Sequence, residues 1–132
     1  MAVFASDQEL YAVLQSVFER LGAEPEKIAP FTHSNLVIRI LLSDPSAEVL
    51  IDGRQPPLEV FYGPRPGNAN LEFSLPADLL HRIWIGEEST SAAFFSGRIK
   101  SKGSLLKATH LIDLFRDIEE IYPAIATEYQ LV

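Results

Sequence analysis

Four short apolar runs in the first half of the chain restrict the folds open to it more than any other feature. Each run has the length and composition of a β-strand, and the segments between them are rich in Gly, Pro, Asn and Asp, which favour turns. Because parallel neighbouring strands usually need connections of roughly a dozen residues or more, such short segments predict an antiparallel meander. The runs span residues 36–42, 48–51, 58–62 and 71–75.

A helix is expected before these strands. Ser6 and Glu9 have the spacing of a capping box and Gly22 is a typical stop, so the sequence predicts a helix over residues 6–22. Its apolar residues recur at helical spacing, which gives the helix one apolar face. The segment that follows, residues 23–35, contains two prolines and is interpreted as a connection.

The second half of the chain changes to a helical period. One helix is predicted over residues 79–84, with Gly86 as its stop, and a short one over residues 92–95. The adjacent carboxylates Glu87 and Glu88 are interpreted as the first turn of that short helix, near the positive end of its dipole.

Alternating residues predict a fifth strand over residues 98–102, followed by a long helix that Ser104 caps and Pro123 ends. The order of elements predicts an α+β fold, in which a sheet of about five, mainly antiparallel strands is covered on one face by helices. Residues 1–132 are expected to form a single domain. The apolar face of the last helix comprises Leu111, Leu114, Phe115, Ile118 and Tyr122.

The composition excludes several classes of function. The chain has no cysteine, which rules out cysteine nucleophiles and thiolate metal sites. Its formal charge of −7 argues against nucleic acid as a partner. No apolar run approaches the roughly 20 residues that a membrane span needs, and the first residues lack the features of a signal peptide. We therefore expect a cytoplasmic protein.

Positive charge is concentrated in one part of this acidic chain. Residues 89–112 include four basic and no acidic side chains, so of the total of −7 the remaining residues carry −11. Arg98, Lys100 and Lys102 alternate along the predicted strand and are candidates for docking to a membrane surface or a protein partner. A charged outer face can also simply keep an edge strand soluble, and this interpretation stays open.

The segment "FFSGRIKSKGSLLKA", residues 94–108, resembles the signature region of the sterol carrier protein 2 family. In that family an aromatic or apolar pair precedes a glycine, a strand of alternating basic residues, a second glycine and the last major helix. The segments "EVLIDGR", "LEFSLPADLL" and "IWIG" come before it in the order expected of the family. The resemblance covers approximately residues 35–121.

This resemblance implies a lipid-binding protein that is not an enzyme. Family members hold a sterol, a fatty acid, an acyl-CoA or another lipid in an apolar tunnel between the sheet and the helices, and can transfer it. No cofactor or metal is implied. The chain lacks the C-terminal Ser-Lys-Leu of peroxisomal members, so import by that signal is not expected. The residues expected to line the tunnel are Leu80, Ile83, Trp84, Phe94, Phe95, Ile99, Leu106 and Leu111.

Two polar residues interrupt the apolar pattern around the expected tunnel. Ser101 stands where the family usually has an apolar residue. With Ile99 it is expected on the inner face of its strand, opposite the three cations, and its hydroxyl would permit a more polar ligand. His81 is interpreted as marking a helix exit or the rim of the apolar layer.

Other interpretations remain beside lipid carriage. The same fold could have a filled core and act as a protein–protein interaction module, since most apolar helix faces only close a core. His110, Asp113 and Asp117 share one flank of the last predicted helix and could suggest a metal or acid–base site, although such a flank is more often solvated and charge-paired. No nucleophile, base and orienting group can be placed together, so catalysis is not expected.

Overall fold

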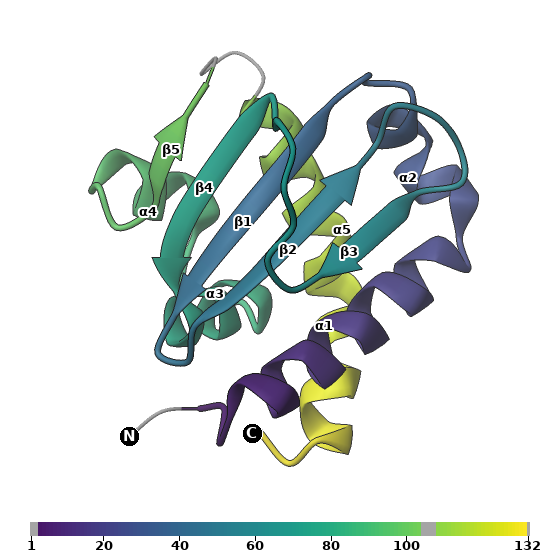
Figure 1. The fold of residues 1–132 in the computed structure, drawn as a ribbon. Coiled ribbons are helices and arrows are strands. Elements are labelled where there is room, and N and C mark those ends of the chain that lie inside the picture. The colour runs from purple at the N-terminus through teal and green to yellow at the C-terminus, as the bar shows by residue number, and fades with distance from the viewer. Residues whose placement is uncertain (1–2, 104–107, 132) are drawn as a thin grey trace.

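The computed structural model describes residues 3–103 and 108–131 as two layers, a five-stranded sheet and a layer of helices (Figure 1). The labelled helices lie behind the sheet in this view, and a connecting segment crosses its front face. The expected α+β class, with a sheet covered on one face by helices, is confirmed. No helix within these residues is long and apolar enough to span a bilayer.

The elements follow the predicted order, with one additional helix after the first. Their bounds are α1 Asp7–Gly22, α2 Pro25–Thr32, β1 Val37–Ser43, β2 Ala47–Asp52, β3 Glu59–Tyr62, β4 Leu71–Pro76, α3 Ala77–Trp84, α4 Thr90–Phe95, β5 Lys100–Lys102 and α5 Ala108–Glu128.

The additional helix, α2, occupies the segment that was interpreted as a connection, so that interpretation is wrong. Pro25 stands at the first helical position, where a missing N–H costs no helical hydrogen bond. Ile28 and Phe31 lie three residues apart on one face and are 4% and 5% exposed. The prolines indicate a loop, but burial of this short apolar face stabilises a helix.

The strands lie in the order β3-β2-β1-β4-β5, and β1 pairs with β4 in parallel. The other pairs are antiparallel, so the sheet is mainly antiparallel as expected, but the predicted meander is wrong at β4. Leu71, Phe73 and Leu75 of β4 are all buried. A strand with so apolar a face buries more surface beside the central β1 than beside the short edge strand β3.

The connection between β3 and β4, residues 63–70, runs across the open face of the sheet to the start of β4 (Figure 1). β3 has only 4 residues, which at roughly 3.3 Å per residue is a strand of about 13 Å. The short connection of residues 63–70 is therefore long enough to run back past β3 and reach the start of β4. The longer connections usual for parallel pairs are needed when the strands are longer and a helix makes the crossover.

Side chains alternate between the inner face of the sheet, which the helices cover, and its open face. On the inner face, Ile38 and Ile40 of β1 lie opposite Leu71 and Phe73 of β4, and none of the four is more than 3% exposed. They belong to one apolar cluster that also includes the buried faces of α1, α3 and α5. The core thus lies between the sheet and the helices, where the resemblance places a tunnel.

The first helix begins as predicted. Ser6 is its N-cap, and the Ser6 hydroxyl accepts a hydrogen bond of 3.1 Å from the backbone N–H of Glu9. At the start of α4 the interpretation of Glu87 and Glu88 is wrong, because Ser89 is the N-cap and both carboxylates precede it.

The last helix does not end at Pro123, so that prediction is wrong: α5 continues through this proline to Glu128. A proline inside a helix costs about 3 kcal/mol or more. Beyond it, Ile125 and Ala126 are fully buried, and one large apolar side chain contributes about 1.5–3 kcal/mol on burial. The predicted cap, Ser104, lies outside the described residues.

Candidate functional site

Four of the residues expected to line a tunnel lie deep between the helices and the sheet. Leu80, Ile83 and Trp84 come from α3, and Leu111 comes from the beginning of α5. Each of the four is at most 1% exposed. The structure therefore brings residues from two separate helices into one apolar layer.

Two more expected residues join them from α4 and from the segment before β5. Phe94 packs edge-on against Phe73 of β4, with ring centroids 5.4 Å apart, and Ile99 is 3% exposed. We call the resulting set of six the inner layer: Leu80, Ile83, Trp84, Phe94, Ile99 and Leu111.

The remaining two expected residues are not part of the inner layer as described. Phe95 is 92% exposed. Successive residues of a helix point about 100° apart, so a helix that directs Phe94 at the sheet turns Phe95 toward solvent. Leu106 lies outside the described residues.

A buried polar pair adjoins the inner layer. His81 Nδ1 and Tyr122 Oη are hydrogen-bonded at 2.7 Å, and both residues are at most 4% exposed. Burial lowers the pKa of His81 and raises the pKa of Tyr122, so both are held neutral. The interpretation of His81 as a rim or exit residue is wrong. Its spacing from Ala77 and Trp84, which are also buried, is the sequence signal that could have placed it inside.

Trp84 is the polar member of the inner layer. Its ring packs against Phe115 and Tyr122 of α5, with centroids 5.3 Å away in both cases. Its indole Nε1 is buried and has no hydrogen-bond partner within the described part of the chain. Leaving a buried donor unpaired costs about 1–3 kcal/mol, so this atom is a place where a partner would be stabilising.

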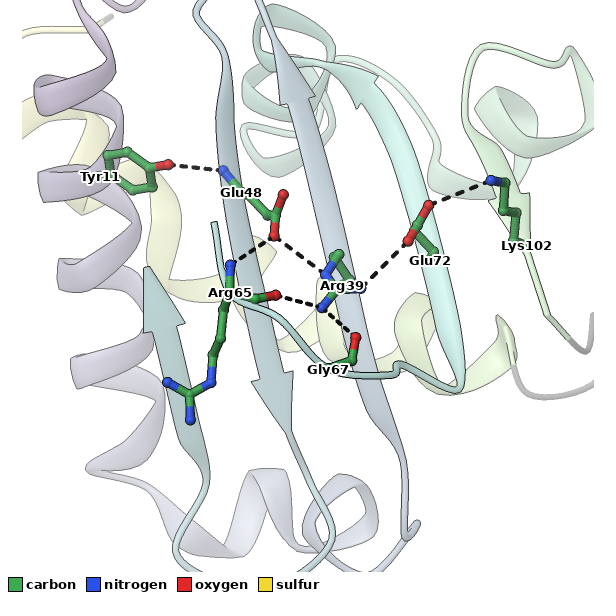
Figure 2. Close-up of polar contacts among 7 residues, drawn as sticks. All are labelled: Tyr11, Arg39, Glu48, Arg65, Gly67, Glu72 and Lys102. Atoms are coloured by element: carbon green, nitrogen blue, oxygen red, sulfur yellow. Dashed lines mark hydrogen bonds and ion pairs between the residues drawn. The ribbon is translucent and has the colours of Figure 1, made fainter. Parts of the chain in front are cut away.

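On the open face of the sheet, Arg39 of β1 is the centre of a charged network (Figure 2). Its guanidinium is 3.4 Å from Glu48 and 3.7 Å from Glu72, the carboxylates on the two neighbouring strands. Its Nη2 donates to the carbonyl oxygens of Arg65 and Gly67, at 2.9 and 3.0 Å. Arg39 therefore ties the crossover of residues 63–70 to the sheet. In the sequence alone, Arg39 is only a charged residue inside the apolar run of residues 36–42.

The network is anchored at both ends. The backbone N–H of Glu48 donates to the hydroxyl of Tyr11 on α1 at 3.0 Å, and the N–H of Arg65 donates to the Glu48 carboxylate at 3.3 Å. At the other end, Lys102 Nζ is 4.0 Å from Glu72 (Figure 2). The Glu48 and Glu72 carboxylates and the Arg39 guanidinium are therefore already ion-paired, and we interpret this part of the open face as structural.

The three cations expected to dock lie at the outer edge of the sheet. In β5, Lys100 is opposite Ser74 and Lys102 is opposite Glu72, so both point to the open face. Arg98 precedes the strand, which is shorter than predicted, and is ion-paired with Glu88. Ser101 is opposite Phe73 on the inner side, as expected, but it is exposed because β5 is the edge.

A shallow hollow of about 370 Å³ lies on the open face beside these cations. Its lining is mainly apolar, and Ser74 and the two cations Arg98 and Lys100 supply polar groups to it. The residues around it include Leu41, Ser74, Leu75, Pro76, Arg98 and Lys100.

The flank of α5 that carries His110, Asp113 and Asp117 forms no metal site in the structure's described residues. These side chains share a hollow of about 240 Å³ with Lys27 of α2. Asp113 is ion-paired with Arg116 at 3.6 Å, and burial raises the pKa of Asp117. The arrangement agrees with the interpretation of a solvated, charge-paired helix flank.

Several solved structures share this fold at low sequence identity. Sterol carrier protein 2 from Yarrowia lipolytica in its apo form is 17% identical, with a TM-score of 0.63 over 86% of this chain and 91% of that chain. The sterol carrier protein domain 2 of Helicoverpa armigera is 18% identical, with a TM-score of 0.64 over 82% and 88%. Palmitated SCP2L2 from Aedes aegypti is 16% identical, with a TM-score of 0.59 over 76% and 92%.

No curated protein sequence matches the chain. A family model described as the SCP-2 sterol transfer family matches residues 14–116, a range that begins inside α1 and reaches into α5. The match is wider at its N-terminal end than the stretch expected from the signature region. Because the model covers well over half of the sequence, and the fold agrees, the chain belongs to the SCP-2 sterol transfer family.

Proposed function

We propose that this protein binds a single lipid between the inner face of the sheet and helices α3, α4 and α5, and carries it without changing it chemically. The ligand class is a sterol, a fatty acid or an acyl-CoA. Family membership supports lipid binding in general, and the inner layer supplies the apolar contacts that the proposal needs. The palmitated state of the Aedes aegypti relative is consistent with a fatty acyl ligand.

The observation that carries the proposal is the unpaired indole N–H of Trp84. This donor is buried in the inner layer, among apolar and aromatic side chains, and has no partner in the described residues. A lipid with a hydroxyl, carbonyl or carboxylate oxygen would satisfy it and bury its hydrocarbon against the same layer. Such a ligand removes the cost of the unpaired donor, so its polar atom is favoured at this position.

Carrying a lipid requires no chemical reaction, because the lipid has nearly the same free energy in the protein as in the membrane. Burying a sixteen-carbon chain contributes on the order of 12 kcal/mol at about 0.8 kcal/mol per methylene. A bilayer already provides almost the same free energy, so a carrier has only to match the membrane. In this proposal the polar atom bound by Trp84 selects the ligand, and the apolar layer holds it.

A second candidate function follows from the same layer. The rings of Trp84, Phe115 and Tyr122 pack closely, and Leu80 and Ile83 are buried beside them. This packing favours a filled core, in which case the protein would act as a protein–protein interaction module. The two candidates differ in whether the helices over the inner layer separate to admit a ligand.

Native mass spectrometry of the freshly purified protein, followed by solvent extraction, tests the proposal directly. We expect a stoichiometric lipid adduct. After removal of the lipid, adding palmitate, palmitoyl-CoA or cholesterol should restore the adduct and change the emission of Trp84, the only tryptophan in the sequence. An unchanged apo mass and an unchanged emission spectrum with all three lipids would establish the filled core instead.

The two adjacent phenylalanines provide a matched pair of variants. Phe94 belongs to the inner layer and packs on Phe73, whereas Phe95 faces solvent. Phe94→Ala should therefore weaken lipid binding by roughly tenfold, whereas Phe95→Ala should change it by less than about twofold. Equal effects of the two substitutions would contradict a ligand site on the inner side of α4.

A further inference from the structure

The corner formed by α4 and β5 combines the exposed large hydrophobic side chain of the described structure with three cations, one of which forms no ion pair with the described residues. Phe95 is the exposed large hydrophobic residue among the residues described. The neighbouring Phe94 faces the other way: its ring packs on Phe73 and holds α4 against the sheet. Phe95 is thus presented outward on a helix whose other face is anchored.

Three cations follow Phe95 within a few residues. Arg98 shares the Glu88 carboxylate with Arg82, so two guanidinium groups are matched by one acid. Lys102 is 4.0 Å from Glu72, which also lies near Arg39. Lys100 forms no ion pair with the residues that the structure describes, and it is exposed. The corner therefore keeps a net positive charge on a chain whose total is −7.

We propose that this corner docks the protein on an anionic lipid bilayer, with Phe95 inserted among the headgroups and Arg98, Lys100 and Lys102 in contact with lipid phosphates. The proposal rests on the proposed carrier function, because a carrier has to reach a membrane to exchange its ligand. It deepens that function by assigning the membrane contact to α4 and β5. A nearby hollow of about 370 Å³, lined in part by Arg98 and Lys100, has room for one headgroup.

Charge decides the orientation of docking. The chain as a whole carries −7 and is repelled by an anionic surface, whereas Arg98, Lys100 and Lys102 at the corner are attracted to it. The molecule is therefore turned with α4 and β5 toward the bilayer. Phe94 and Ile99, which belong to the inner layer, lie directly behind this corner, so docking places the proposed ligand site next to the membrane.

Vesicle flotation of the full chain tests the proposal, with vesicles of phosphatidylcholine alone and of phosphatidylcholine mixed with phosphatidylglycerol. Binding is expected to the mixed vesicles and to weaken as salt is raised. Lys100→Gln should lower partitioning by about fivefold, and Phe95→Ser by roughly tenfold. Arg116→Gln, which removes an exposed cation on α5, is the matched control and should have little effect.

A fluorescence measurement shows whether Phe95 itself enters the bilayer. In the double variant Trp84→Phe, Phe95→Trp, the only tryptophan stands at the corner, and its emission should shift to the blue with mixed vesicles. No binding of the natural protein to mixed vesicles, or an Arg116→Gln effect equal to that of Lys100→Gln, would overturn the proposal. Binding to phosphatidylglycerol headgroups without a blue shift would overturn the insertion of residue 95.

The vesicle experiments and the lipid-adduct experiment can fail independently, so the docking proposal and the carrier proposal are tested separately. A lipid adduct in native mass spectrometry with no vesicle binding would retain the ligand site and refute the docking corner. Vesicle binding by a protein that never carries a lipid would support the corner and refute the carrier. Capture of an acidic protein by the same three cations, with no affinity for vesicles, would refute the membrane assignment.

Discussion

At the scale of single residues, the buried pair of His81 and Tyr122 links the stability of the protein to pH. The imidazole is neutral in the folded protein because burial lowers the pKa of His81. In the unfolded chain the same group takes up a proton near pH 6.5. The folded state therefore binds fewer protons than the unfolded state as the pH falls through that value.

We predict that the free energy of unfolding decreases as the pH falls from about 6.5 toward the lower folded pKa of His81. The stability contributed by the neutral imidazole is fully present above the unfolded pKa and is lost below it. Urea unfolding between pH 7.5 and about 5 measures this slope. His33→Gln serves as the control, since His33 is exposed and its removal should leave the slope intact. His81→Gln should reduce the slope, and an unchanged slope in that variant would contradict the assignment.

At the scale of elements, the crossover of residues 63–70 depends on Arg39. One guanidinium is paired with two carboxylates and donates to two backbone carbonyls of the crossover. Asn70 continues the attachment, because its side-chain oxygen accepts a hydrogen bond of 2.8 Å from the N–H of Val37. The parallel pairing of β1 with β4 and the path of this segment are thus stabilised together.

Arg39→Ala is predicted to lower the free energy of unfolding by about 2–4 kcal/mol, because it removes the cation that is ion-paired with Glu48 and Glu72 and leaves the two crossover carbonyls without their donor. Amide hydrogen exchange should also accelerate in residues 63–70. The control is Arg54→Ala, which breaks an ion pair with Asp52 at an exposed guanidinium and should cost less than about 1 kcal/mol. Similar losses in the two variants would show that the crossover is held by other contacts.

At the scale of the whole molecule, ligand binding should raise the stability of every element that closes over the inner layer. A ligand that binds only the folded state adds about 2.7 kcal/mol when its concentration is a hundred times its dissociation constant. We predict that the melting temperature of delipidated protein rises with the concentration of the bound lipid. Phe94→Ala should weaken this dependence more than Phe95→Ala. A melting temperature independent of lipid would favour the interaction module.

Much of the fold could be predicted from local patterns. The cap at Ser6, the four strand runs, the helix after β4 and the α+β class follow from hydrophobic period and turn composition, because these signals act within a few residues. The predictions that were wrong concern elements whose formation depends on tertiary contacts. α2 forms despite its prolines because Ile28 and Phe31 are buried, and α5 passes Pro123 because Ile125 beyond it is buried. Burial by distant parts of the chain is not visible in a window of sequence.

The candidate site divides in the same way. The sequence by itself determined the supply of apolar residues, the island of positive charge and the family signature at residues 94–108. Only the tertiary structure decided that Phe94 faces inward while Phe95 faces solvent, that His81 is paired with Tyr122, and that the buried indole N–H of Trp84 has no hydrogen-bond partner among the described residues. The physical reason is that chemical identity belongs to each residue, whereas burial, pairing and direction arise only when segments distant in the chain pack together.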